Sequence, residues 1–358
     1  MEVPASPWLR FKHAPLPLFP CDLLPVSHPP YPNGYASCGF YSYGRISPMT
    51  TPTVERISAD SLTRKSLWLA AIKPPMYSVA VIPILVGSLL AWLETGRLDG
   101  RILGIFLISA VLLLVWENLS NDVYDADTGI DKNKHHSLVN LTKNQPLIFW
   151  LGNISLVLGV MGVLAITLLQ QDFTVLGLIL LCCALGYLYQ GPPFRLGYQG
   201  LGEPLCFISF GLGVAAAYYA QAQTFSLSCW GLGAIIGMAT TLVLFCSHFH
   251  QVSDDVAAGK RSPIVRLGTL GGANLLPWLC GSIFVMLLGG LLLGFFPVSL
   301  MLVLASAPFA LQLCRHVKLY HDQPELVQNA KFVAIRFQFC CGILVCLGLL
   351  LPITLRSF

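Results

Sequence analysis

Residues 102–131 read ILGIFLISAVLLLVWENLSNDVYDADTGID, an apolar run that ends in a cluster of carboxylates. The apolar part, from Ile102 to Leu119, approaches the roughly 20 residues that a helix needs to cross about 30 Å of hydrocarbon. The acids follow at once, as Asp122, Asp125, Asp127 and Asp131. Carboxylates near a membrane are costly unless water, a cation or a partner meets them, so something positive is expected to bind here.

The composition of the whole chain indicates a polytopic membrane protein. Its mean hydropathy is +0.69 over 358 residues, of which 55% are hydrophobic and 11% charged. An ordinary soluble domain carries roughly 25% charged residues. In lipid every backbone polar group must be bonded internally, which favours an all-α bundle, and the alternating strands of a membrane barrel are absent from the sequence.

Apolar runs of sufficient length predict about nine transmembrane helices. Their approximate spans are Ser66 to Trp92, Ile102 to Leu119, Leu147 to Leu169, Thr174 to Tyr189, Leu205 to Ala222, Cys229 to Ser247, Ala273 to Gly294, Pro297 to Cys314 and Phe332 to Leu351. With an odd number of spans and an inner N-terminus, most basic residues fall in inner-side segments, as the positive-inside rule requires. The same assignment puts both acidic clusters of the chain on one face of the membrane.

The first 57 residues differ from the rest of the chain. They are rich in proline, and before Glu55 their only acids are Glu2 and Asp22. No continuous apolar core of a secretory signal is present. We expect a plastid transit peptide over residues 1–57, with a disordered cytosolic tail as the alternative, and a membrane domain over residues 58–358.

The first acidic cluster predicts a magnesium site. Asp122 and Asp125 are three residues apart, so they share a face of a helix, although an aspartate at a helix end also acts as a cap. Gly129 permits a turn that would bring Asp131 back toward them. A hard divalent cation relieves their mutual repulsion, and oxygen ligands favour Mg²⁺, which keeps places for water and substrate phosphates.

The second acidic cluster, Asp254 and Asp255, is followed closely by Lys260. Arg195, in an earlier loop, is expected on the same face of the membrane. Carboxylates for a metal beside cations for a polyanion suit a diphosphate ester. The alternative for Lys260 and Arg195 is that they only signal topology. The nearby histidines His248 and His250 either ligate metal or form hydrogen bonds within the bundle.

Several motifs together resemble those of the UbiA-type intramembrane prenyltransferases. The run NDxxDxxxGxD, from Asn121 to Asp131, resembles the first aspartate motif of the naphthoate-prenylating members. Residues 68–74, 189–203 and 255–268 resemble the opening segment, the middle loop and the second aspartate motif. The resemblance covers roughly residues 60–355. It implies a helical membrane enzyme that transfers a prenyl group from its diphosphate.

One segment departs from the pattern of many family members. Where they carry Asn-Asn-x-Arg-Asp before the second cluster, this chain has Ser-His-Phe-His-Gln over residues 247–251. Gln251 replaces the usual aspartate and cannot supply a charged ligand. If this second site holds Mg²⁺, Asp254 and Asp255 must supply more of the coordination. The His-Phe-His-Gln form resembles the plant and cyanobacterial branch, which makes phylloquinone.

For this branch the resemblance implies phytyl diphosphate as donor and 1,4-dihydroxy-2-naphthoate as acceptor, joined with loss of carbon dioxide. It assigns Asn121, Asp122 and Asp125, with Asp131 as a further ligand, to the first Mg²⁺ and the diphosphate. Asp254 and Asp255 would serve a second Mg²⁺. Lys260 and Arg195 are the expected diphosphate contacts, and Lys73 is a candidate for the acceptor's carboxylate. Cation stabilisation by ring faces and packing are both open for Tyr124, Tyr187 and Tyr189.

The resemblance also implies a multi-pass protein of a chloroplast membrane, either inner envelope or thylakoid. Its partners are the two substrates and lipid, and it implies no nucleic acid and no protein partner. Alternatives are another aromatic acceptor, such as homogentisate or 4-hydroxybenzoate, and a membrane phosphotransferase. A cation-coupled transporter is a further alternative, but transporters place their acids near the bilayer midplane rather than at span ends.

Overall fold

The computed structural model describes residues 74–130 and 137–356, and every regular element in this range is a helix. This confirms the predicted all-α fold. In chain order the elements are η2 Pro74–Tyr77, α2 Ser78–Thr95, α3 Gly100–Thr128, α4 Leu138–Thr142, α5 Gln145–Gln170, α6 Thr174–Gln190, α7 Gly202–Ala222, α8 Leu227–Ser247, η3 His248–His250, α9 Val252–Ala257, α10 Pro263–Leu292, η4 Val298–Ser306, α11 Ala307–Tyr320, α12 Pro324–Val327 and α13 Ala330–Arg356.

The long helices correspond one to one with the predicted spans. Eight helices of the described range are long and apolar enough to cross a membrane, with η4 and α11 together forming one of them. The remaining predicted span is α6, which has 17 residues. At 1.5 Å per residue α6 is about 25 Å long, close to the thickness of the hydrocarbon core. The beginning of the first predicted span lies outside the described residues.

Specific residues set the ends of the first helices. The backbone of Gly96 adopts φ 72°, which ends α2 with a bond from its N–H to the carbonyl of Trp92. Asp99 then caps α3 by accepting hydrogen bonds from the N–H groups of Arg101 and Ile102. At its other end α3 stops at Gly129, where φ is 74°, a value that glycine adopts without strain. The turn predicted at Gly129 is therefore present.

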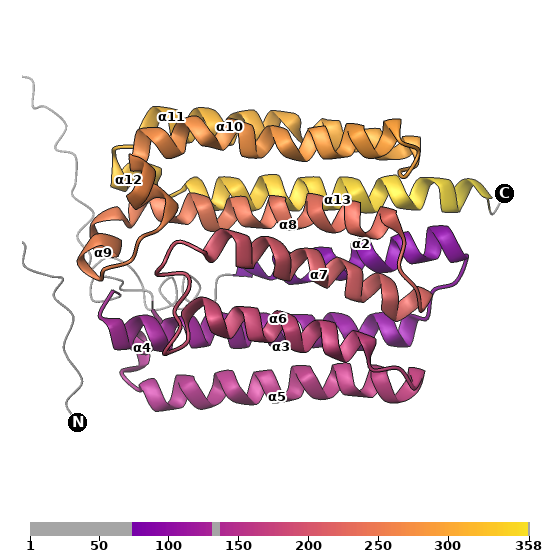
Figure 1. Cartoon of the computed structure of the whole chain (residues 1–358), viewed down its shortest axis with the longest axis horizontal. Coiled ribbons are helices and arrows are strands. Elements are labelled where there is room, and N and C mark those ends of the chain that lie inside the picture. The colour runs from indigo at the N-terminus through magenta and orange to yellow at the C-terminus, as the bar shows by residue number, and fades with distance from the viewer. Residues whose placement is uncertain (1–73, 131–136, 357–358) are drawn as a thin grey trace, which may run out of the picture. The chain divides into compact units, whose positions relative to one another are not determined.

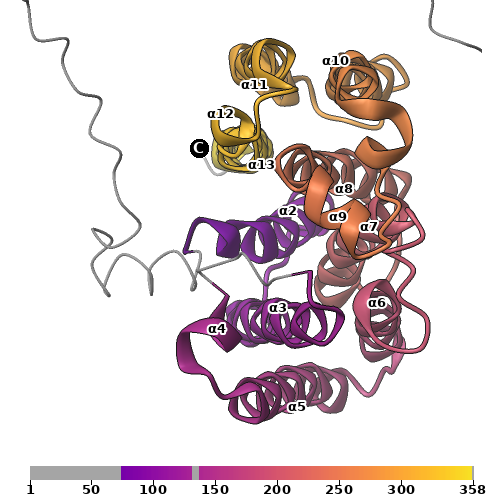
Figure 2. The same cartoon turned by 90° about the vertical axis from the view of Figure 1, so that its left-hand side faces the viewer.

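Helix α8 lies in the interior of the bundle, and α3 and α5 face outward. In the most apolar stretch of the α8 span, 72% of the residues are buried. In the corresponding stretches of the α3 and α5 spans, 22% are buried. Small residues allow close backbone contact: a Cβ atom on Gly233 of α8 would lie 2.8 Å from the carbonyl oxygen of Gly211 on α7. Such small-residue contacts are how helices associate tightly in lipid. Figure 2 shows α2 and α8 between the α3, α5 and α6 side and the α10, α11 and α13 side.

Successive long helices run antiparallel, and this brings the segments with the predicted site residues to one end of the bundle. The C-terminal end of α3 and the short helices α4, α9 and α12 all lie at the left in Figure 1. The loop between α6 and α7 belongs to the same end, because α6 runs toward it and α7 away from it. Both acidic clusters are therefore on one face, as expected from the sequence. Basic residues at this end include Lys143, Arg195, Lys260, Arg261, Arg266, Lys318 and Lys331.

Candidate active site

The first cluster occupies the last two turns of α3. Asn121 and Asp125 lie four residues apart on one helical face, and the side-chain amide of Asn121 donates to Asp125 Oδ2 at 3.0 Å. Asp122 is buried, and its Oδ2 accepts the backbone N–H of Leu138 at the start of α4 at 3.0 Å. Asn121 and Asp125 are thus a directly bonded pair. Asp122 instead fixes the position of the segment that follows the cluster.

Tyr198, in the loop between α6 and α7, completes the surroundings of Asp125. Its hydroxyl donates to Asp125 Oδ1 at 3.1 Å and shares a hydrogen bond with Thr128 Oγ1 at 2.7 Å. Burial and the neighbouring Asp125 carboxylate raise the pKa of Tyr198, so its hydroxyl remains a donor at neutral pH. The sequence assigned no role to Tyr198, because a tyrosine in a loop carries no signal of its partner.

The second cluster is a buried chain of charged groups. Asp255 Oδ1 lies 3.4 Å from Lys260 Nζ, and its Oδ2 lies 3.4 Å from His248 Nδ1. His248 Nε2 is in turn 3.4 Å from Glu203 Oε1, at the start of α7. Burial alone would raise the pKa of Asp255, but the neighbouring His248 ring and the charge of Lys260 hold it below its usual value. His248 thus lies between two carboxylates inside the bundle, at ion-pair distance from each.

Tyr198 joins the two clusters. The Lys260 ammonium lies over its ring, 5.7 Å from the ring centre, while its hydroxyl bonds Asp125. The backbone of the two loops is also linked, because the N–H of Arg261 donates to the carbonyl of Tyr198 at 2.7 Å. The Arg266 guanidinium donates to the backbone carbonyls of Gln199 and Arg261. Arg266 therefore braces the loops.

Arg195 lies in the same loop as Tyr198 and close enough to influence its hydroxyl electrostatically. Its Nε is buried, and among the described residues it meets no hydrogen-bond acceptor. The backbone at Arg195 has φ 44°, a conformation that side-chain-bearing residues rarely adopt. A buried guanidinium nitrogen without an acceptor is costly, so an anion is the partner that its position calls for.

The three tyrosines named in the sequence take different positions. Tyr124 and Tyr187 meet edge to face, with ring centres 6.2 Å apart, and the Tyr187 hydroxyl donates to the carbonyl of Pro192. The ring of Tyr189 packs so closely on Gly197 and Gly202 that a Cβ atom on either would lie under 3 Å from it. Both packing arrangements tie α6 to its neighbours.

Several predicted residues fall outside the described part of the chain, namely the leader over 1–57, Lys73 and Asp131. Within the described residues there is no group of three or more His, Cys, Asp or Glu side chains placed to hold one metal ion. The described oxygen ligands are instead split between the two clusters, with Asn121, Asp122 and Asp125 in one and Asp254 and Asp255 in the other. Asp254 is the more exposed of the second pair.

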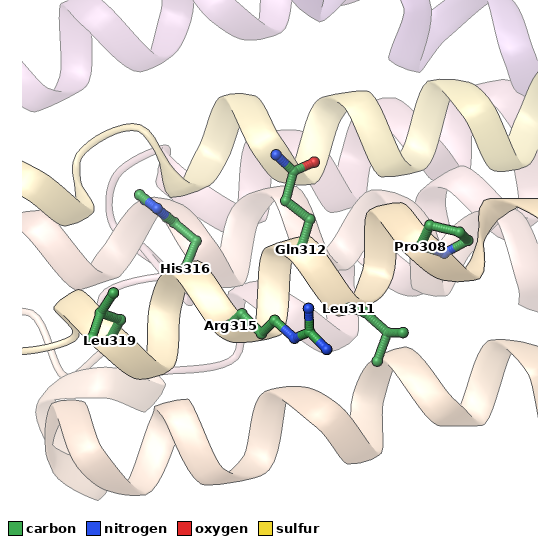
Figure 3. Close-up of a pocket in the computed structure, with 6 residues that line it drawn as sticks. All are labelled: Pro308, Leu311, Gln312, Arg315, His316 and Leu319. Atoms are coloured by element: carbon green, nitrogen blue, oxygen red, sulfur yellow. The ribbon is translucent and has the colours of Figure 1, made fainter.

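A separate open hollow lies on α11, away from both clusters (Figure 3). Its lining comes from this one helix, and the Gln312 and His316 side chains point to one side of the helix while Arg315 and Leu311 point to the other. The residues that line it are Pro308, Leu311, Gln312, Arg315, His316 and Leu319. It contains none of the predicted site residues.

Comparison with known proteins gives one family. The model of the UbiA prenyltransferase family matches residues 80–341. A 2-carboxy-1,4-naphthoquinone phytyltransferase of Synechocystis sp. is 51% identical over 304 residues, which cover 85% of this chain and 96% of the relative. The chloroplastic 2-carboxy-1,4-naphthoquinone phytyltransferase of Arabidopsis thaliana is 40% identical, over 82% of this chain and 79% of the relative.

A solved structure supports the fold. The UbiA homologue from Archaeoglobus fulgidus, bound to GPP and Mg²⁺, superposes with a TM-score of 0.53. The match covers 78% of this chain and 99% of the archaeal chain, at 13% sequence identity. At this identity the likeness concerns the arrangement of helices alone.

Proposed function

This chain belongs to the UbiA prenyltransferase family, and from that premise we propose that it transfers a phytyl group from phytyl diphosphate to 1,4-dihydroxy-2-naphthoate, with loss of carbon dioxide. The chain is a multi-pass membrane prenyltransferase. The product would be the demethylated precursor of phylloquinone. The specific donor and acceptor are taken from the two phytyltransferases that share 51% and 40% of its residues over most of its length.

The observation that carries this proposal is the junction of the two aspartate clusters through Tyr198, beside Arg195. Asn121 and Asp125 offer oxygen ligands on one helical face, and Asp122, the residue after Asn121, adds a carboxylate. An all-oxygen donor set fits Mg²⁺, the ion bound with GPP in the archaeal homologue. Asn121, Asp122 and Asp125 would hold the first Mg²⁺ with Asp131. When bound, Mg²⁺ would neutralise the charge that develops on the departing diphosphate.

In the second cluster Asp254 and Asp255 would hold a second Mg²⁺. The two Asp255 oxygens face Lys260 and His248, each at 3.4 Å. Lys260 and Arg195 would contact the diphosphate, and the buried Nε of Arg195 supports this role. These cations act by lowering the energy of the anion that leaves, which is electrostatic stabilisation of the transition state.

The chemistry requires an electron-rich acceptor ring. The dihydroxynaphthoate is the reduced form of 2-carboxy-1,4-naphthoquinone, the compound named for both relatives. Loss of diphosphate leaves an allylic cation, which the ring attacks through its carboxyl-bearing carbon. Ring faces of Tyr124 and Tyr189 near Asp125 would stabilise the cation. Lys73 remains our candidate for the acceptor's carboxylate.

We place the enzyme in a chloroplast membrane, either the inner envelope or the thylakoid. The support is the chloroplastic relative of Arabidopsis thaliana and the acid-poor segment at the start of the chain. Residues 1–57 would be the transit peptide and residues 58–358 the catalytic membrane domain. Import into isolated chloroplasts, followed by sequencing of the new N-terminus, tests both statements. Failure of import, or a protein that keeps residue 1, would contradict them.

A membrane assay tests the proposed reaction. Membranes containing the recombinant protein are supplied with Mg²⁺, phytyl diphosphate and 1,4-dihydroxy-2-naphthoate, beside the variants Asp122→Ala and Asp127→Asn. Asp127 belongs to the same acidic run but is exposed and bonded to Gln145, so Asp127→Asn is the matched control. Prenylated product from the parent and Asp127→Asn, lost in Asp122→Ala, is the expected result. Product only from homogentisate or 4-hydroxybenzoate would reject the proposed acceptor. Full activity in Asp122→Ala as well as in Asp127→Asn would reject the metal assignment.

A further inference from the structure

Glu117 lies on α3 one turn deeper in the membrane than the metal-binding residues. It precedes Asn121 by four residues and Asp125 by eight, so all three share one face of the helix. At 1.5 Å per residue it lies roughly 6 Å below Asn121 along the helix axis. A diphosphate held at Asn121 and Asp125 would leave the reacting carbon and the acceptor ring at about this depth.

The carboxylate of Glu117 is directed at α6. It lies against Gly186, where any side chain would run into Oε2. The side-chain amide of Gln190 bonds the backbone carbonyl of Glu117, at 3.1 Å, and not its carboxylate. Among the described residues the carboxylate has no hydrogen-bond or ion-pair partner. Gly186 therefore leaves space for the carboxylate on the α6 side, and the hydrogen bond from α6 goes to the Glu117 backbone.

The groups near Glu117 on the neighbouring helices are two thiols and a phenol. Cys183 and Tyr189 of α6 and Cys206 of α7 are within electrostatic range of its carboxylate. Tyr189 is also within range of Asp125 and of Glu203. Glu117 and the two clusters therefore surround one interior region around Tyr189.

An acid at this depth is expensive unless it serves the reaction. Asp and Glu in transmembrane segments are rare, and those that occur face the bundle interior and mark functional sites. The residues proposed for the metal and the diphosphate are engaged at the end of the bundle, and Glu117 is the carboxylate on the same face of α3 at the depth of the acceptor ring.

We propose that Glu117 is a catalytic residue that accepts the proton of the ring hydroxyl next to the carboxyl-bearing carbon and later returns it. This inference rests on the proposed function. As the oxygen–hydrogen bond of the 1-hydroxyl breaks, its electron pair forms a carbonyl and the ring carbon bonds the allylic carbon, whose bond to diphosphate has broken. The proton resides on Glu117. The adduct is a β-keto acid.

Carbon dioxide then leaves this adduct, and the electron pair of the broken carbon–carbon bond passes to the carbonyl oxygen. Glu117 returns its proton to that oxygen, which restores the hydroxyl and the aromatic ring. The net reaction is prenyl diphosphate plus dihydroxynaphthoate giving prenylated dihydroxynaphthalene, carbon dioxide and diphosphate. Glu117 ends in its initial state, and no oxidant or reductant is needed.

The test compares Glu117→Gln, Glu117→Asp and the control Glu94→Gln in full-length protein in membranes. Glu94 is an exposed acid at the opposite end of the bundle, bonded to the Tyr218 hydroxyl. Donor ionisation is followed separately, without acceptor, by oxygen-isotope scrambling between the bridging and non-bridging positions of the diphosphate. General bases contribute about 100-fold or more, so we expect Glu117→Gln to lower kcat roughly 100-fold while scrambling and the donor KM stay within about twofold.

Glu117→Asp keeps the acid on a shorter side chain, so its kcat should be about tenfold higher than that of Glu117→Gln. The kcat of Glu94→Gln should match that of the parent within about twofold. A Glu117→Gln protein that retains the parental kcat would overturn the inference. So would a loss of scrambling equal to the loss of kcat, because Glu117 would then act on the donor or on folding. If the parent prenylates only homogentisate or 4-hydroxybenzoate, the proposed acceptor fails, and the same comparison on that ring's hydroxyl still decides the role of Glu117.

Discussion

Tyr198 shows how a single side chain links two motifs that are far apart in the chain, since its partners Asp125 and Lys260 are separated by 135 positions. Its hydroxyl bonds Asp125 of the first cluster, and its ring lies beneath Lys260 of the second. The aspartates and basic residues could be singled out as candidates because their charge is anomalous in a membrane segment. Tyr198 was not, because its role depends on which loop packs on α3, a fact that spacing in the sequence does not contain.

Replacing Tyr198 by phenylalanine should weaken the first cluster without disturbing the ring beneath Lys260. One hydrogen bond to a charged group contributes about 1.5 kcal/mol, so we expect roughly a tenfold loss of kcat/KM and a higher Mg²⁺ concentration for half-maximal activity. The control is Tyr219→Phe, which removes a hydroxyl bond to Asp172 at the other end of the bundle. Equal Mg²⁺ dependence for parent and Tyr198→Phe would mean that the hydroxyl does not position Asp125.

The Lys260 and Asp255 pair predicts a measurable effect on stability. Lys260→Met leaves the buried Asp255 carboxylate with His248 as its partner, and breaking a buried pair typically costs about 3 kcal/mol. Thermal unfolding of the detergent-purified protein should therefore begin at a lower temperature. Adding Asp255→Asn should recover part of the loss, because it removes the uncompensated charge.

Lys318→Met is the matched control for this comparison, since Lys318 is exposed and bonds only the side chain of Asn274 in the described part of the chain. Its unfolding temperature should stay close to that of the parent. If Lys260→Met unfolds at the parental temperature, the ion pair does not stabilise the second cluster.

At the scale of elements, the contact between α2 and α7 depends on Gly87. A Cβ atom there would overlap the carbonyl oxygen of Val214 and lie 2.7 Å from the backbone nitrogen of Tyr218. Backbone atoms cannot yield as a flexible side chain does. Gly87→Ala should therefore destabilise the protein by about 1–3 kcal/mol, seen as a lower unfolding temperature.

Gly104→Ala tests the same change where space is available. A Cβ atom on Gly104 of α3 meets nothing within 4 Å, and alanine favours helix by about 1 kcal/mol over glycine. We expect an unchanged or higher unfolding temperature. Equal destabilisation by both substitutions would show that glycine flexibility, rather than close contact, matters at Gly87.

The helices themselves were largely predictable, because apolar length is written directly in the sequence. Differences arose at their ends. Helix α10 begins at Pro263, ten residues before the predicted Ala273, and contains a non-helical turn at Gly268, where φ is 72°. Residues 263–272 read PIVRLGTLGG, in which Arg266, Thr269 and three glycines lower the mean hydropathy, so the apolar run used for the prediction starts after them. Proline at the first turn and glycine at the break are local signals that mark this extension.

At the scale of the whole molecule, the even alternation of helices explains why the two clusters meet. Each hairpin returns the chain to the same end, so the ends of α3 and α8 and the loop after α6 converge (Figure 1). Sequence order predicted this convergence. It did not predict the partner of each acid, such as the amide of Leu138 for Asp122 or His248 for Glu203, because those depend on three-dimensional packing. Lys73 and Asp131 remain predictions.

The most direct measurement supplies the protein with phytyl diphosphate, Mg²⁺ and dihydroxynaphthoate labelled in its carboxyl carbon, and counts labelled carbon dioxide against prenylated product. The account predicts equal amounts of the two from the parent and neither from Asp122→Ala. Product that keeps the labelled carboxyl would contradict decarboxylation at the site of attack. Cation flux in proteoliposomes with no prenyl transfer to any ring would contradict the enzyme itself.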